Sequence, residues 1–138
     1  GCAFKIYFYS KNMNDAIIFV YNAKSGLIAG LSDSVTKIVA PSQYECNLCK
    51  ITYGPLSMKE EWAHFLETLP QKKVFLHKDE LKGSYEALNK YALPAIFLDH
   101  DNKFSLLISK YRLNALKSVA ELKKILQSAL VLGPITLK

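Results

Sequence analysis

The chain lacks several features that would mark common classes of protein. Its longest apolar runs, such as 16–21 and 95–98, are far shorter than the roughly 20 residues needed to cross a bilayer, so no transmembrane segment is expected. Three cysteines in 138 residues are too few for a disulfide-stapled secreted scaffold. Neither a glycine-rich phosphate loop nor a Gly-x-Ser-x-Gly motif is present. Nucleotide hydrolysis and serine hydrolysis are therefore unsupported.

Arginine is also scarce, and this bears on the positive net charge of +6. Arg112 is the one arginine, and the lysines are scattered, with Lys72-Lys73 and Lys123-Lys124 as the densest groups. Phosphate recognition usually mixes arginine with lysine and concentrates both on one face. Solvated lysines on helix surfaces are the favoured interpretation, so no nucleic-acid partner is expected.

The composition is that of a folded globular protein. Half of the residues are hydrophobic and 12% are aromatic, which excludes disorder. We find no internal repeat and no linker rich in glycine or serine. The sequence therefore predicts a single domain covering residues 1–138.

Strand and helix patterns alternate along this domain. A β-branched run predicts a buried strand at 16–21, and Ser57 and Glu60 have the spacing of a capping box that opens a helix with Trp62 on its apolar face. Ser118 and Glu121 repeat that spacing before the last helix. Further strands are predicted at 73–77, 93–98 and 104–108, and further helices at 27–39 and 81–91. The predicted fold class is α/β, with a mixed sheet and helices on both faces.

Cys46-Asn47-Leu48-Cys49 is the most specific chemical signal. A C-x-x-C pair can cycle between dithiol and disulfide, or supply half the ligands of a zinc site. Residues 51–53 favour extended structure and Gly54-Pro55 breaks it, yet in a regular strand two side chains three apart point to opposite faces. The motif works only where the chain turns, in an accessible loop. As a dithiol, Cys46 would be the nucleophile and Cys49 the resolving thiol.

Other uses of these cysteines remain open. Zinc would need further ligands from Cys2, His77 or His100, whereas His64 is expected to face solvent. Burial as two small hydrophobic side chains is the structural alternative. Haem attachment fails because residue 50 is lysine, and no cofactor is expected. The polar segment 77–80 is interpreted as a solvated loop, and 99–102 as the turn of a β-hairpin whose returning strand is 104–108.

From Cys46 onward the element order resembles the thioredoxin-like superfamily. Pro94, before the strand at 95–98, looks like that family's cis proline, which lies against the cysteines. The resemblance implies a thioredoxin-like fold, thiol–disulfide exchange at Cys46 and Cys49, a groove shaped by Pro94, and a protein thiol or disulfide as partner. Residues 21–26 and 46–54 also resemble a small uncharacterised bacterial family, which brings no activity with it.

Several features depart from the family pattern. The helix after the cysteines is expected to begin only at Ser57, the segment 41–45 makes a poor strand, and Glu45 stands where the family has an aromatic residue. In a second registration, the turn at 22–26 occupies the active-site loop, and the cysteines lie on an inserted element. The competing function is therefore a non-catalytic binding or accessory module with structural or zinc-binding cysteines.

The first residues bear on location. The sequence begins at Gly1-Cys2 instead of methionine, which is expected of a processed or trimmed chain. A cytoplasmic location is slightly favoured, and a lipoprotein or periplasmic one would fit a Gly1-Cys2 junction. Substrate and oligomeric state cannot be read from the sequence.

Overall fold

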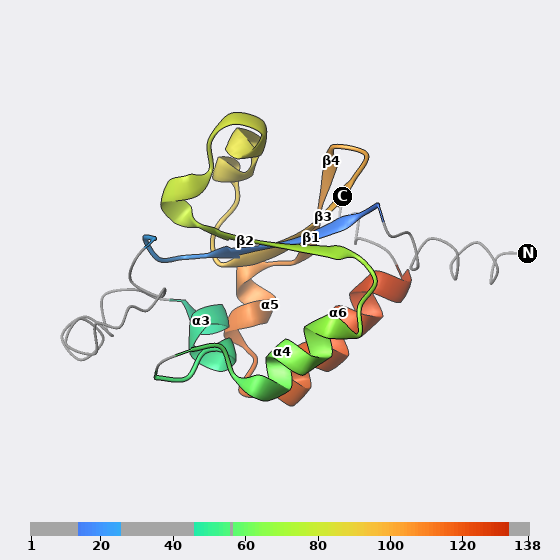
Figure 1. Ribbon diagram of the computed structural model, residues 1–138. Coiled ribbons are helices and arrows are strands. Elements are labelled where there is room, and N and C mark those ends of the chain that lie inside the picture. The colour runs from blue at the N-terminus through green and yellow to red at the C-terminus, as the bar shows by residue number, and fades with distance from the viewer. Residues whose placement is uncertain (1–13, 26–45, 56, 133–138) are drawn as a thin grey trace, which may run out of the picture.

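The computed structural model describes residues 14–25, 46–55 and 57–132 (Figure 1). The helix predicted at 27–39, the segment 41–45 and the Gly1-Cys2 end lie outside the described residues. The elements in chain order are β1 (Ala16–Tyr21), α3 (Asn47–Thr52), α4 (Glu60–Glu67), β2 (Lys72–His77), the 3-10 helices η2 (Lys78–Glu80) and η3 (Gly83–Lys90), β3 (Ala95–His100), β4 (Lys103–Ile108), α5 (Lys110–Asn114) and α6 (Val119–Leu132).

The four strands form one mixed sheet in the order β2-β1-β3-β4. β1 pairs with β2 in parallel and with β3 antiparallel, and β4 returns antiparallel to β3. Every residue of β1 is buried, as its continuous apolar run predicts for a strand covered on both faces. The mixed α/β class and the antiparallel hairpin are therefore confirmed.

Alternate residues of β1 face two separate hydrophobic clusters. Ile17, Phe19 and Tyr21 pack with side chains of the α-helices, whereas Ile18 and Val20 pack with Leu88 of η3. Figure 1 shows α3 to α6 below the sheet and the 3-10 helices above it. Helical segments thus cover both faces, and the helix predicted at 81–91 is present as the 3-10 helix η3.

Trp62 of α4 is the largest fully buried side chain and lies against β1, as its place on the apolar stripe predicts. Its ring meets Phe19 edge-on at 6.0 Å and stacks on Phe65 at 5.5 Å between centroids. His64, on the same helix, is exposed as predicted. These contacts fix α4 against the sheet and leave its opposite side to solvent.

The predicted start of this helix is wrong. α4 begins at Glu60, and Lys59, its N-cap, makes no side-chain capping bond. The Ser57 carbonyl accepts a hydrogen bond from the Gly54 N–H at 2.8 Å, and Tyr53 forms a β-bridge with Met58. Ser57 is therefore held in a tight turn, where it cannot take part in a capping box.

The C-terminal half follows the prediction more closely. The turn between β3 and β4 is the pair Asp101-Asn102, both at positive φ, as a two-residue hairpin turn requires. Asp99 and His100, predicted as part of the turn, belong to β3 instead. The Glu121 N–H donates to Ser118 Oγ at 3.2 Å before α6, so the predicted cap is present, although the Glu121 carboxylate accepts from the Lys117 N–H instead of completing a capping box. α5 was not predicted. None of the described helices is both long and apolar enough to cross a membrane.

Candidate functional site

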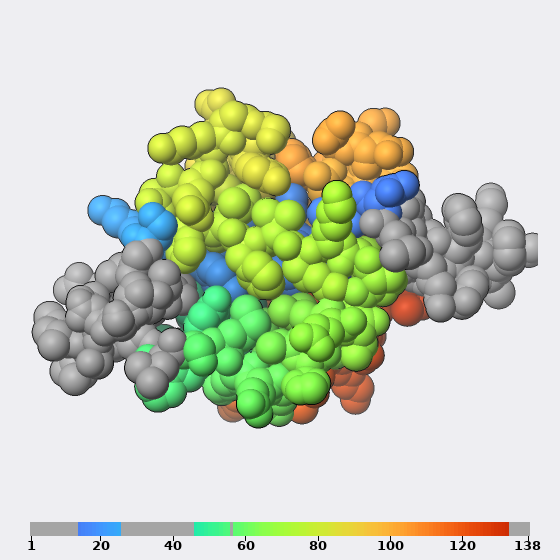
Figure 2. All heavy atoms as spheres, in the orientation of Figure 1, coloured from blue at the N-terminus to red at the C-terminus, as the bar shows by residue number. Residues whose placement is uncertain are grey.

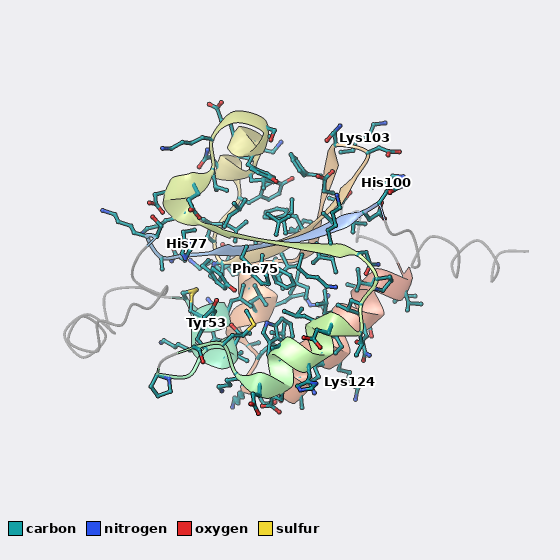
Figure 3. The ribbon with its side chains drawn as sticks, in the orientation of Figure 1. Tyr53, Phe75, His77, His100, Lys103 and Lys124 are labelled. Carbon is teal, nitrogen blue, oxygen red and sulfur yellow. A yellow bond between two sulfur atoms is a disulfide. The ribbon has the colours of Figure 1, made fainter. Side chains whose placement is uncertain are left out.

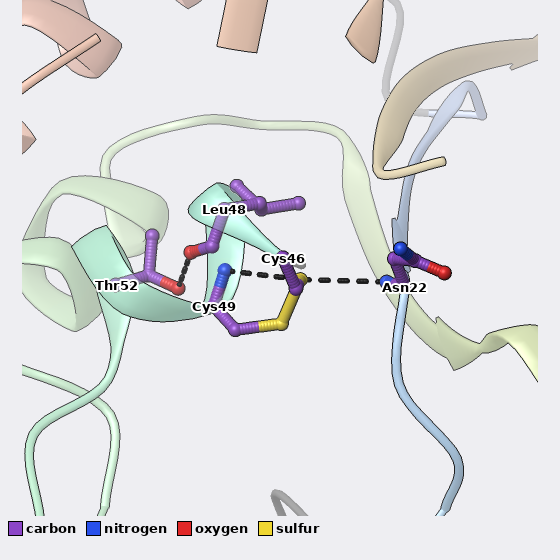
Figure 4. The surroundings of a disulfide bond; sticks show 5 residues. All are labelled: Asn22, Cys46, Leu48, Cys49 and Thr52. Carbon is purple, nitrogen blue, oxygen red and sulfur yellow. Dashed lines mark hydrogen bonds between the residues drawn. A yellow bond between two sulfur atoms is a disulfide. The ribbon is translucent and has the colours of Figure 1, made fainter. Parts of the chain in front are cut away.

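Cys46 and Cys49 form a disulfide, with 2.02 Å between their sulfur atoms and 5.2 Å between their Cα atoms (Figure 4). Cys46 is the N-cap of α3, and Cys49 lies in the first turn of that helix. The prediction that a helix begins only at Ser57 after the cysteines is wrong, because α3 already begins at Asn47 inside the motif. The extended structure predicted at 51–53 is also wrong for Ile51 and Thr52, which are helical. The chain turns at the motif, so both sulfurs lie on one side.

Two backbone N–H groups point at the sulfur of Cys46. The Asn22 N–H donates to Cys46 Sγ at 3.4 Å and the Cys49 N–H donates at 3.3 Å (Figure 4). Asn22 is the first residue after β1, so the chain leaves the sheet there and returns to the same point at Cys46. The two registrations on the thioredoxin-like pattern place either the cysteine motif or the turn after β1 in the active-site loop. In the structure these two segments are in contact.

Both cysteines are buried. Cys46 is 0% and Cys49 4% exposed, and both belong to the cluster that contains Phe19 and Trp62. The expectation of an accessible loop is therefore wrong. Any reaction of this disulfide with a macromolecule needs a local opening that exposes a sulfur atom.

Asn47, inside the motif, joins α3 to α5. Its side-chain Nδ2 donates to the carbonyl of Leu113 at 2.6 Å and to that of Leu116 at 3.0 Å. Leu113 lies in the last turn of α5 and Leu116 just past its end, and the Leu113 carbonyl also accepts from the Leu116 N–H at 3.2 Å. Sequence reasoning treated Asn47 as a turn residue and missed this role, because α5 itself was not predicted.

Pro94 lies at the same edge of the sheet as the disulfide. Ala95 pairs with Val20 near the end of β1, and Pro94, preceded by a cis peptide bond, comes directly before Ala95. Pro94 is buried. The edge therefore holds the end of β1, the start of β3 and the disulfide.

An aromatic group of Tyr21, Tyr53 and His77 lies at this edge too (Figure 3). The Tyr21 ring is 5.8 Å from the Tyr53 ring and 5.6 Å from the His77 ring. Burial, with the neighbouring Tyr53 hydroxyl, raises the pKa of Tyr21 well above its ordinary value. Tyr21 therefore stays neutral and acts as a packing residue beside Phe75.

The segment 77–80 is more ordered than a solvated loop. Glu80 accepts from the His77 backbone N–H at 2.7 Å and lies 2.8 Å from His77 Nδ1, and Asp79 accepts from Ser25 through its N–H and its hydroxyl at 2.8 Å each. These hydrogen bonds lower the pKa of both carboxyl groups. Both carboxylates are ionised, and Asp79 ties η2 to the turn after β1.

His100 lies at the opposite edge, so it cannot share a metal ion with His77 (Figure 3). Its Nδ1 is 2.7 Å from a carboxylate oxygen of the buried Asp15, and this hydrogen bond raises the pKa of His100. Within the described ranges, no three His, Cys, Asp or Glu side chains are grouped to hold a metal ion. Cys2, the remaining zinc candidate, lies outside the described residues.

Comparisons with protein-family models, with curated proteins and with solved structures gave no match.

Proposed function

We propose that this is a thioredoxin-like protein that exchanges thiols and disulfides at Cys46 and Cys49. The observation that carries the proposal is a C-x-x-C disulfide at the start of a helix, beside the end of the central strand β1. The strand order β2-β1-β3-β4, with Pro94 directly before β3, supports the same interpretation. The order of elements from the cysteines onward also fits that resemblance.

The proposed reaction is a two-electron transfer. The Cys46 thiolate attacks one sulfur of a partner disulfide, forms a mixed disulfide and releases one partner thiolate. The Cys49 thiolate then attacks Cys46 Sγ, which forms the Cys46–Cys49 bond and releases the second partner thiolate. The partner disulfide is reduced, the protein is oxidised, and a dithiol reductant of either small-molecule or protein class restores the starting state.

The hydrogen bonds to Cys46 suit the role of nucleophile. In the dithiol state, the N–H groups of Asn22 and Cys49 would donate to a thiolate and stabilise it. Each hydrogen bond to a charged group contributes about 1.5–3 kcal/mol, which offsets the cost of burying the anion. α3 has six residues, so we attribute less of this stabilisation to its dipole.

A purely structural disulfide is the competing function, and the burial of both sulfurs favours it. The span of the bond argues the other way. The two cysteines are three positions apart, so the bond closes the smallest kind of loop. Loop-closure entropy for such a loop gives about 2 kcal/mol, against almost 5 kcal/mol for a 100-residue loop. The bond is therefore a weak staple for the fold.

Trapping of a mixed disulfide tests the proposal. The Cys2→Ser background leaves Cys46 and Cys49 as the two remaining cysteines. The reduced protein with Cys49→Ser is mixed with a peptide that contains one disulfide, and the covalent product is followed by mass spectrometry. We expect a stable mixed disulfide at Cys46, because the resolving thiol is missing.

The matched control is Cys46→Ser in the same background, which keeps the buried Cys49 alone. We expect this variant to form mixed disulfide at least tenfold more slowly. Equal rates for the two variants, or no product with either, would contradict the assignment of Cys46 as nucleophile and favour the structural alternative.

A further inference from the structure

We infer that the surface formed by α3 and α5 docks an acidic segment of the partner protein beside the disulfide. The inference rests on the proposed function, since it names the chemistry of the partner that the exchange reaction would use. We call this surface the α3/α5 face and define it by residues 46–55 and 109–118. Its two segments are neighbours, because α3 and α5 lie side by side under the sheet (Figure 1).

The charge of the α3/α5 face has one sign. Its charged side chains are all cationic, and neither of its two segments contains an aspartate or a glutamate. They are Lys50 on α3, Lys110 and Arg112 on α5, and Lys117 after α5. The Glu121 carboxylate of α6 lies against this face, where it accepts from the Lys117 N–H at 2.7 Å. Four positive charges beside this one negative charge still leave a net positive field that attracts acidic groups.

The neighbouring segments of this sheet edge do not cancel that field. Lys24 and Lys78 contribute two positive charges, and the ionised Asp79 and Glu80 contribute two negative ones. Among the described residues, the charges of these neighbouring segments therefore balance. On η2, by contrast, Lys78 is followed directly by Asp79 and Glu80.

Tyr111 supplies an anchor in the middle of the charged region. It lies between Lys110 and Arg112 and is 75% exposed, one of three large hydrophobic side chains that the described residues leave exposed. The other two, Val131 and Leu132, lie at the end of α6. Tyrosine and arginine are among the residue types most enriched at binding hot spots, so the exposed Tyr111 and Arg112 suit contact with a protein more than a solvated role.

Hydrogen bonds connect α5 to the helix that carries the disulfide. Asn47, the residue after Cys46, holds the carbonyls of Leu113 and Leu116 through its side chain. A partner docked on α5 therefore lies against the helix that carries both cysteines. This contiguity favours a protein partner that presents a disulfide over a nucleic acid, which would have no use for the cysteines.

Peptide binding tests docking separately from chemistry. The full chain with Cys46→Ser and Cys49→Ser is titrated with fluorescent peptides of one length, carrying either four glutamates or four lysines, at 20 and 300 mM salt. We expect the acidic peptide to bind at least tenfold more tightly at low salt, and this preference to shrink at high salt as surface charges are screened.

Two pairs of substitutions locate the site. Lys110→Gln with Arg112→Gln should weaken binding of the acidic peptide at least fivefold. The matched control is Lys103→Gln with Lys124→Gln, which removes the same charge from side chains away from the α3/α5 face (Figure 3). It should change the affinity less than twofold. Equal losses in both pairs, or tighter binding of a DNA duplex than of the acidic peptide, would overturn the inference.

A kinetic arm separates this inference from the proposed function. The reduced Cys2→Ser protein is given peptide disulfides flanked by glutamate, glutamine or lysine residues. We expect the glutamate peptide to be reduced fastest and the advantage to be lost with Lys110→Gln and Arg112→Gln. Equal reduction of all three peptides would overturn the docking inference alone. Reduction of none, with acidic binding intact, would contradict the proposed function alone.

Discussion

Reduction of the Cys46–Cys49 bond should lower the free energy of unfolding by about 2 kcal/mol and leave the protein folded. The magnitude follows from the separation of three positions between the cysteines. A bond across so few residues removes little entropy from the unfolded chain, because neighbouring residues already stay close together. The freed sulfurs stay in their buried cluster, and Cys46 Sγ keeps the hydrogen bonds from the Asn22 and Cys49 N–H groups, so the native state incurs little further cost.

Urea unfolding of the Cys2→Ser protein, with and without a phosphine reductant, measures this quantity. The chain contains one tryptophan, Trp62, and its complete burial makes its fluorescence a direct probe of the core. With an m-value of about 2 kcal/mol/M, the midpoint should fall by about 1 M urea and the slope should stay the same. The Cys46→Ser, Cys49→Ser protein should match the reduced protein and not respond to reductant.

Two results would refute this reasoning. A loss above about 4 kcal/mol, or unfolding on reduction alone, would show that the disulfide is a structural staple despite its short span. A midpoint that does not move would show that the bond fails to constrain the unfolded chain. The first result would remove the argument that sets a redox role above a structural one, and the second would contradict the calculated magnitude.

Three further predictions concern the scaffold. Trp62→Ala should cost about 3–5 kcal/mol in thermal unfolding followed by circular dichroism, because it leaves a cavity against Phe19; a negligible shift would contradict the packing of α4. Asn47→Ala should lower the free energy of unfolding by about 1–3 kcal/mol, because two hydrogen bonds are lost. The control Asn114→Ala, at an exposed position, should change it by less than about 0.5 kcal/mol. Equal effects of the two substitutions would contradict the link between α3 and α5. The raised pKa of His100 stabilises the fold fully below the ordinary value of 6.5, and this contribution should be lost as pH rises through the raised pKa. His100→Gln should remove that slope from urea midpoints measured between pH 5.5 and 9, and an unchanged slope would contradict the assignment.

The strands could be predicted because burial leaves a strong pattern. The apolar run of β1 requires cover on both faces, and the polar pair Asp101-Asn102 fits a two-residue turn at positive φ. These features depend on residues close together in the sequence. The mixed sheet could therefore be predicted from these local patterns.

The local structure around the cysteines could not be predicted, because long-range contacts override local preference there. Ile51 and Thr52 favour a strand by propensity, yet they are helical and buried in α3. The hydroxyl of Thr52 bonds back to the Leu48 carbonyl at 2.6 Å, and Cys46 caps the helix with a sulfur, which no capping rule anticipates. The burial of the disulfide and the role of Asn47 depend on α5, more than 60 residues away along the chain.

The reactivity of Cys46 in the reduced protein tests the central claim most directly. In the Cys2→Ser, Cys49→Ser protein, the rate of alkylation by iodoacetamide is measured from pH 5 to 9, beside a short unstructured peptide with one cysteine. The account predicts a substantial thiolate fraction at pH 6–7, because the Asn22 N–H and the N–H of residue 49 donate to the sulfur, so that alkylation there exceeds that of the peptide. A rate that matches the peptide at pH 6–7, or falls below it, would contradict the claim and leave the disulfide a structural feature.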